Sequence, residues 1–270
     1  MATKRTLSLG IGLRMIGVAL VCTSLFVTSP RFSLAQEPTA DSKTPLLKPP
    51  PGLQQLGTHR LWIDLKRRLV VVDGSVCLRE GQLEMFACPK GTKEHEAVIA
   101  IDCGAQFLHA ALLSVGARSG NTVKYEPEYK PASGTTIDIY LLWRSKDGKK
   151  HQTRAQNWVR YLKTGKAMPY DWVFAGSGFW TDEATQQRHY MADAGDMICV
   201  SNFNTAMLDL PIKSTAAAAD LLFTAYKKHI PPLQTPVRLV LIPRPPLSDA
   251  AAELPPEPPR ATGNTPKSAP

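Results

Sequence analysis

The densest group of polar side chains in the 270-residue sequence is Gly91-Thr92-Lys93-Glu94-His95-Glu96, which leads into an apolar segment. In an extended chain alternate side chains share a face, so Lys93 and His95 are expected together, with the glutamates opposite. A neighbouring lysine disfavours the imidazolium form and leaves a neutral ring that can accept a proton. One hypothesis is therefore an enzyme, an envelope hydrolase or transferase. His95 would be its base, Glu84 or Glu96 would orient the ring, and Lys93 would stabilise an anion. The alternative is a solvated loop.

Four cysteines, Cys77, Cys88, Cys103 and Cys199, lie beyond the first 35 residues. If residues 79–81 form a hairpin turn, Cys77 lies opposite Leu83, and about five residues of ladder, roughly 17 Å, separate it from Cys88. The same register argument, with a loop near residue 92, separates Cys88 from Cys103. We expect most of the four cysteines to be buried free thiols. A long-range disulfide bond to Cys199 remains an open alternative. A metal or redox site at Cys88, His95 and Cys103 is a further alternative, although the sequence holds no C-x-x-C motif.

Aromatic residues gather around Gly176-Ser177-Gly178. The glycines flank the serine directly, so the G-x-S-x-G nucleophile motif is absent and the segment is expected to be a tight turn or bulge. Trp172, Phe179 and Trp180 could stack on a sugar or a peptide, and core packing is the alternative.

The elements that would position these residues are mostly strands. Alternating or β-branched segments bounded by turn residues predict strands at 59–65, 68–78, 82–87, 96–102, 137–144, 151–155, 172–175, 188–191, 197–201 and 236–242. Asp147-Gly148 predicts a hairpin turn between the fifth and sixth of these.

Two segments have helical periodicity. The first holds Phe107, Leu108, Ala111, Leu112 and Val115 and ends at Gly116. The second would be capped by Ser214 or Thr215 and would place Leu221, Leu222, Ala225 and Tyr226 on one face. We therefore predict an α+β fold: a mostly antiparallel β-sheet with two helices packed on it, in a single domain.

The distribution of proline predicts the domain boundaries. Prolines are dense between residues 30 and 51 and again after residue 230, and they are sparse between. Because proline removes a backbone donor, this pattern predicts one folded domain at 58–244. Residues 36–57 are then a linker, and residues 245–270 are a disordered proline-rich tail.

Residues 1–35 have the pattern of a secretory signal peptide. Positive charge extends to Arg14, an apolar segment spans 15–27, and Ser33-Leu34-Ala35 offers a cleavage site after Ala35. That apolar segment is shorter than the roughly 20 residues of a membrane-spanning helix. We expect a secreted or periplasmic protein that meets the membrane only during export.

The charge of the chain does not indicate nucleic-acid binding. The formal charge is +9, and residues 1–35 hold four of the 32 basic and none of the 23 acidic residues, so +5 remains after cleavage. Basic and acidic residues are interleaved, which is typical of solvated turns. No pattern indicates a cofactor, and the expected partner is an envelope component or a small ligand.

Residues 58–244 resemble the YdjY-type domain found in exported and envelope proteins of bacteria. The resemblance rests on segments spread along the domain, namely Cys77-Leu78-Arg79-Glu80-Gly81-Gln82-Leu83-Glu84, Phe86-Ala87-Cys88-Pro89, residues 91–96, His109-Ala110-Ala111-Leu112-Leu113, Trp172-Val173-Phe174-Ala175-Gly176-Ser177 and Asp196-Met197-Ile198-Cys199-Val200-Ser201-Asn202. It implies an envelope location and assigns no catalytic residue. The leading hypothesis is a non-catalytic binding or structural module.

Overall fold

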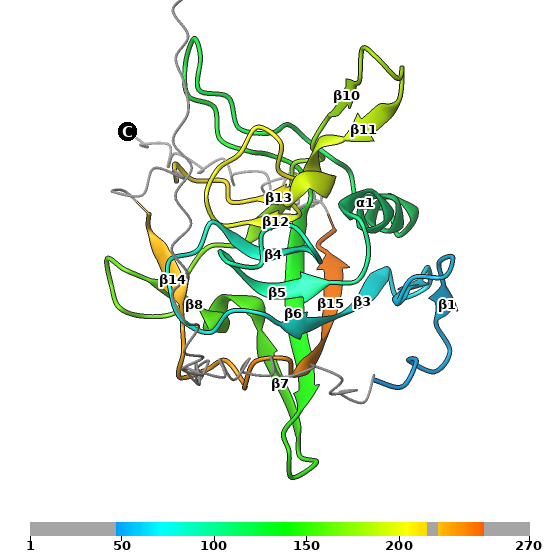
Figure 1. Cartoon of the computed structure of the whole chain (residues 1–270), viewed down its shortest axis with the longest axis vertical. Coiled ribbons are helices and arrows are strands. Elements are labelled where there is room, and N and C mark those ends of the chain that lie inside the picture. The colour runs from blue at the N-terminus through cyan, green and yellow to red at the C-terminus, as the bar shows by residue number, and fades with distance from the viewer. Residues whose placement is uncertain (1–46, 215–220, 246–270) are drawn as a thin grey trace, which may run out of the picture. The chain divides into compact units, whose positions relative to one another are not determined.

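The computed structural model describes residues 47–214 and 221–245, and these residues are mostly β-structure (Figure 1). Eight strands pair in the order β3-β15-β6-β9-β13-β12-β4-β5, and β5 pairs in turn with β3. The pairing therefore closes into a barrel. Its strands are β3 (Leu69–Val76), β4 (Met85–Pro89), β5 (Ala97–Ile101), β6 (Thr136–Arg144), β9 (Trp172–Phe174), β12 (Ile198–Cys199), β13 (Leu208–Asp209) and β15 (Pro236–Pro243).

Shorter elements surround the barrel. β1 pairs with β2, β2 pairs with β3, and β7 forms a hairpin with β6. Two further two-stranded sheets are β8 with β14 and β10 with β11. The bounds of these elements are β1 (Gln54–Gln55), β2 (Leu61–Asp64), β7 (Lys150–Arg154), β8 (Val159–Tyr161), β10 (Phe179–Thr181), β11 (Arg188–Tyr190), β14 (Phe223–Ala225), the α-helix α1 (Ala105–Ser114) and the short 3₁₀ helices η1 (Ala155–Trp158) and η2 (Met191–Ala194).

Alternating burial explains why these segments form barrel strands. Along β15 the side chains of Val237, Leu239 and Leu241 are fully buried, and the residues between them are partly exposed. β4 and β5 are buried at every position, as expected of parallel strands that are covered on both faces.

The barrel closes where β3 changes partners. The first half of β3 pairs with β2, and its last three residues pair with β5. A β-carbon on Gly74 would lie 2.6 Å from the carbonyl oxygen of Ala100, so glycine allows the two backbones to approach.

The prediction of an α+β fold with two helices on a sheet is wrong. The described residues form a closed barrel with one α-helix. The first predicted helix is confirmed as α1. Where the second was predicted, Phe223–Ala225 form β14, and Phe223 is buried against the ring of Tyr161 on β8. The hydroxyl of Ser214 donates to the carbonyl of Val200. Residues 215–220, the predicted start of that helix, lie outside the described residues.

Two predicted strand pairings are also wrong, although the strands themselves exist. β3 and β4 do not form a hairpin, because the chain between them crosses to β14, where Leu83 N donates to Phe223 O. β4 and β5 are parallel, with Cys88 opposite Ala100. Residues 90–96 therefore run back along the length of β4, in place of the predicted loop centred near residue 92. The β6–β7 hairpin around Asp147-Gly148 is confirmed.

Residues 47–57, which the sequence analysis assigns to a linker, contact the barrel. β1 pairs with β2, and Leu56 packs on the core. The guanidinium group of Arg60 donates to Leu47 O, and that of Arg238 donates to Lys48 O at 2.8 Å. Both arginines also pair with Asp73.

The predicted signal peptide, residues 36–46 of the linker and residues 246–270 of the tail lie outside the described residues. Within the part of the chain that the structure describes, no helix is long and apolar enough to cross a membrane.

Candidate functional site

Lys93, in the connection between β4 and β5, is the centre of a group of charged side chains. Its ammonium nitrogen lies 3.0 Å from Asp196 Oδ1 and 3.7 Å from Glu96 Oε1. It also lies 4.7 Å from the ring centroid of Phe203. Burial opposes the charge of Lys93, but its hydrogen bond to Asp196 and the charge of that residue outweigh burial and raise the pKa of Lys93. The lysine is therefore a cation, held as an ion pair.

The absence of a side chain at Gly195 makes room for the stem of this lysine. Gly195 has a φ of +139°, and a β-carbon there would lie 2.5 Å from Lys93 Cδ. An alanine at this position would collide with the lysine stem in addition to straining the backbone. Thr205 donates its hydroxyl to Asp196 Oδ2, which fixes the carboxylate that faces the lysine.

Glu84 completes the group, which we call the Lys93 cluster (Glu84, Lys93, Glu96 and Asp196). Burial raises the pKa of Glu84, and the charge of Glu96 raises it further, while Lys93 lowers it. The backbone joins the two glutamates, because Glu84 N donates to Glu96 O at 3.3 Å. A carboxyl group in this setting takes up a proton more readily than an exposed glutamate.

His95 lies at the exposed edge of the Lys93 cluster. Its side chain is 76% exposed, and its nearest charged neighbour is Glu96, at 3.9 Å from Nε2 to Oε2. Residues 93–96 form a turn in which Glu96 N donates to Lys93 O, so Glu96 does not lie opposite Lys93 and His95 as expected, and both side chains approach its carboxylate. Of the four predicted residues, the structure thus brings Glu84, Lys93 and Glu96 together in the cluster and places His95 at its exposed edge. It adds Asp196, which the sequence analysis did not connect to them.

Three thiols lie in an apolar cluster together with Met85, Ala97, Phe203 and Ala206. Burial raises the pKa of Cys77 to about 12, raises that of Cys88, and raises that of Cys199 well above its usual value. All four described cysteines are free, which confirms the predicted free thiols. Since the thiolate is the nucleophile, these thiols are poor nucleophiles.

The alternative metal or redox site does not form. Cys103 lies in the main core, Cys88 lies in the smaller apolar cluster, and His95 faces solvent. Among the described residues, no three histidine, cysteine, aspartate or glutamate side chains are arranged to hold a metal ion.

A second polar group surrounds Asp209, which is fully buried on β13. Burial raises the pKa of this carboxyl to about 7. Asn202 Nδ2 donates to Asp209 Oδ1 at 3.0 Å, while Oδ2 has no partner among the described residues. Tyr125 and Tyr129 donate their hydroxyls to the same asparagine. These bonds fasten the loop between α1 and β6 to the barrel.

The three aromatic residues considered as a stacking platform separate in the structure. Trp172 is buried in the core, and its indole N–H donates to Cys199 O at 2.7 Å. Phe179 and Trp180 are 49% and 47% exposed on β10. Ser177 donates its hydroxyl to Thr205 O within a turn of positive φ, as expected of a structural serine.

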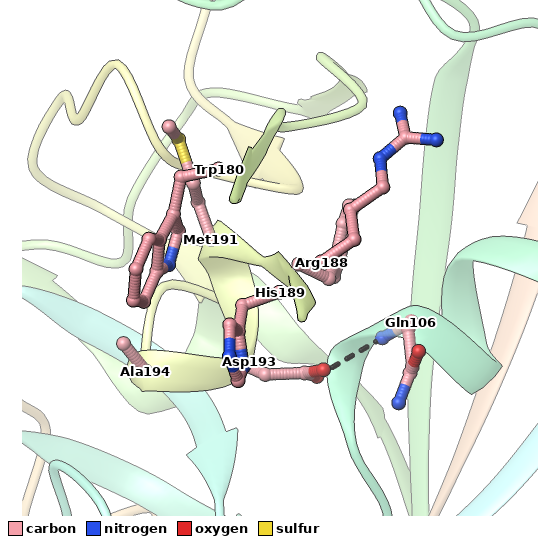
Figure 2. Close-up of a pocket in the computed structure, with 8 residues that line it drawn as sticks. Gln106, Trp180, Arg188, His189, Met191, Asp193 and Ala194 are labelled. Atoms are coloured by element: carbon pink, nitrogen blue, oxygen red, sulfur yellow. Dashed lines mark hydrogen bonds between the residues drawn. The ribbon is translucent and has the colours of Figure 1, made fainter. Parts of the chain in front are cut away.

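The exposed hairpin β10–β11 borders a pocket of about 340 Å³ (Figure 2). Its residues come from α1, β10, β11 and η2, so distant parts of the sequence form it. We call it the hairpin pocket; it is lined by Gln106, Trp180, Arg188, His189, Tyr190, Met191, Asp193 and Ala194.

Asp193 links the pocket to the helix. Gly104, which precedes α1, offers no side-chain cap, and Asp193 Oδ1 accepts the backbone N–H of Gln106 at 3.1 Å instead (Figure 2). A carboxylate at this end of a helix also complements the helix dipole. The sequence pattern indicates Trp180 as a stacking candidate but does not indicate Gln106, His189 and Asp193 as its neighbours, because only the fold brings them together.

Comparison with known proteins identifies the family. The model of the YdjY domain matches residues 61–242, so the chain belongs to the YdjY domain family and the predicted resemblance is confirmed. No curated protein and no solved structure shows significant similarity to the chain.

Proposed function

We propose that this chain is an exported protein of the bacterial cell envelope whose YdjY domain is a non-catalytic binding module. Its contact face is the side of hairpin β10–β11 that carries Trp180, together with the hairpin pocket. The signal-like pattern of residues 1–35 supports export.

The observation that carries the proposal is the exposure of the large aromatic side chain of Trp180 beside a pocket. Trp180 is 47% exposed and lines the hairpin pocket, whereas Trp172 is buried in the core. Large apolar side chains that stay exposed next to polar groups are typical of binding sites. The charged groups of the Lys93 cluster are, by contrast, already engaged with one another.

Co-sedimentation with insoluble bacterial envelope material tests this proposal. We expect the purified chain lacking residues 1–35 to sediment with envelope fragments and Trp180→Ala to remain in the supernatant. Phe179→Ala, at an equally exposed ring, is the matched control and should sediment normally. Equal behaviour of wild type and Trp180→Ala would contradict the proposal.

The raised pKa of Glu84 favours a second candidate function, acid–base catalysis by an envelope hydrolase or transferase. Glu84 would be the acid, Glu96 its partner and Lys93 the stabiliser of an anion, with His95 at the rim as an exposed base. This hypothesis expects soluble sugars or peptides to be released from envelope material by the wild type and not by Glu84→Gln. Equal release by both would exclude it.

A further inference from the structure

The hairpin β10–β11 is held in one conformation although it lies outside the barrel. The hydroxyl of Tyr190 donates to Gly176 O at 2.9 Å and contacts His109 Nδ1 at 2.7 Å. Met191 N donates to Gly178 O, which closes the base of the hairpin. At the tip, Asp182 Oδ1 accepts two backbone N–H groups at 2.8 and 2.9 Å. A surface held in this way loses little entropy when a ligand binds.

The two faces of the hairpin carry different groups. Trp180 pairs with His189 across the strands, and the two rings stack with centroids 4.7 Å apart and planes 22° apart. Successive side chains of a strand point to opposite faces, so Phe179 and Arg188 lie on the other face. There the guanidinium carbon of Arg188 lies 4.1 Å from the ring centroid of Phe179. Figure 2 accordingly shows this guanidinium directed away from Asp193 and Gln106.

The polar groups of the hairpin pocket suit hydroxyl groups. The side-chain amide of Gln106 offers a donor and an acceptor, and the ring of His189 offers one of each when neutral. Asp193 uses Oδ1 to cap α1, and its Oδ2 has no hydrogen-bond partner among the described residues. The pocket holds this one carboxylate and no lysine, and its arginine head is engaged with Phe179. The carboxylate of Asp193 would therefore repel an anionic ligand in the pocket.

From these features, and building on the proposed function, we infer that the hairpin pocket binds a neutral carbohydrate chain through stacking on Trp180. A pyranose ring with equatorial hydroxyls presents a flat C–H face to an aromatic ring. Its rim of hydroxyls, each both a donor and an acceptor, matches the amide, carboxylate and imidazole groups of the pocket. The volume of about 340 Å³ is at the small end for ligand pockets, which suits one or two sugar units of a longer chain.

Titration calorimetry with two soluble probes, cellotetraose and N-acetylchitotetraose, tests the inference on the chain lacking residues 1–35. We expect at least one probe to bind, and Trp180→Ala to weaken it by about tenfold, which is the loss of one well-stacked aromatic contact. Trp180→Phe should bind at an intermediate level. Asp193→Asn keeps an oxygen to cap α1 and should weaken binding by about fivefold, because it loses one charge-assisted hydrogen bond.

Controls separate loss of binding from loss of folding. Phe179→Ala removes the aromatic ring on the opposite face and should change the dissociation constant by less than about twofold. Thermal melting should show each variant folded at the assay temperature. Binding that is equal in wild type and Trp180→Ala would overturn the inference.

The outcomes for the inference and the proposed function are distinguishable. If envelope sedimentation depends on Trp180 but neither tetrasaccharide binds or competes, the proposed function stands and the carbohydrate inference is overturned in favour of a peptide component. If sedimentation does not depend on Trp180, the proposed function fails. If a tetrasaccharide nevertheless binds through Trp180, the carbohydrate inference alone survives.

Discussion

Lys93 Nζ lies 3.0 Å from Asp196 Oδ1, and this ion pair joins the connection between β4 and β5 to the segment that precedes β12. The side chains of Lys93 and Asp196 are 27% and 9% exposed, so the pair is only partly screened by water. Removing the lysine would leave Asp196, Glu84 and Glu96 close together without their cation.

We therefore expect Lys93→Met to lower the free energy of unfolding by about 2 kcal/mol, less than a fully buried pair would cost. Lys90→Met is the matched control, because Lys90 and its partner Asp102 are 69% and 49% exposed. It should change stability by less than about 0.5 kcal/mol. Urea unfolding of both variants measures the difference, and equal values would mean that the Lys93 pair contributes no more than a surface pair.

Asp209 should make stability depend on pH. Burial raises its pKa from 3.8 to about 7, so the folded chain keeps the proton where the unfolded chain has lost it. The stabilisation is complete below about pH 4 and is lost as the pH rises to about 7. Asp209→Asn should match the wild type near pH 4 and be more stable by about 2 kcal/mol at pH 8. Parallel stability curves across this range would show that Asp209 ionises normally in the fold.

Residues 47–57 should stabilise the barrel. A chain that begins at residue 58 lacks β1, the packing of Leu56 and the carbonyl partners of Arg60 and Arg238. We expect its free energy of unfolding to be about 2 kcal/mol lower than that of a chain that begins at residue 47. Calorimetric melting compares the two, and identical melting temperatures would show that this segment is the linker that the sequence pattern predicted.

The cysteines should react only when the fold opens. Their pKa values are raised by burial, and that of Cys103 reaches about 12. In the chain without residues 1–35, a thiol reagent at pH 8 should modify them slowly in the folded protein. In denaturant without reductant it should modify all four at once. Fewer than four reactive thiols in denaturant would reveal a disulfide bond.

Local sequence patterns predicted the strands and the helix α1 well, but they predicted poorly which strands pair with one another. Most strands formed, as did α1 and the hairpin at Asp147-Gly148, because alternation and turn chemistry are local. The failures at β4 and β14 depend on distant partners. The spacing of residues 221–226 fits a helix, but Phe223 gains a buried site and a ladder with β8 as a strand. Contacts with strands that are distant in the sequence decide between helix and strand here, and they leave no signal in a short stretch of sequence.

The candidate sites show the same contrast between local patterns, which were predicted, and long-range contacts, which were not. Glu84, Lys93 and Glu96 were found because they lie near one another in sequence, and β4 and β5 are neighbours. Asp196 was missed because β12 reaches β4 only through the barrel order. The prediction that Glu96 faces away from Lys93 and His95 was wrong because residues 93–96 turn. Trp180 was one of three aromatic residues considered for stacking, with core packing as the alternative, whereas Gln106 and Asp193 meet it only through α1 and η2.

One envelope co-sedimentation experiment distinguishes the two candidate sites, with Trp180→Ala and Lys93→Gln assayed side by side below their melting temperatures. If the hairpin pocket is the contact site, Trp180→Ala loses most of the bound fraction and Lys93→Gln binds like the wild type. The reverse result, with binding lost in Lys93→Gln and kept in Trp180→Ala, would contradict the proposed contact site.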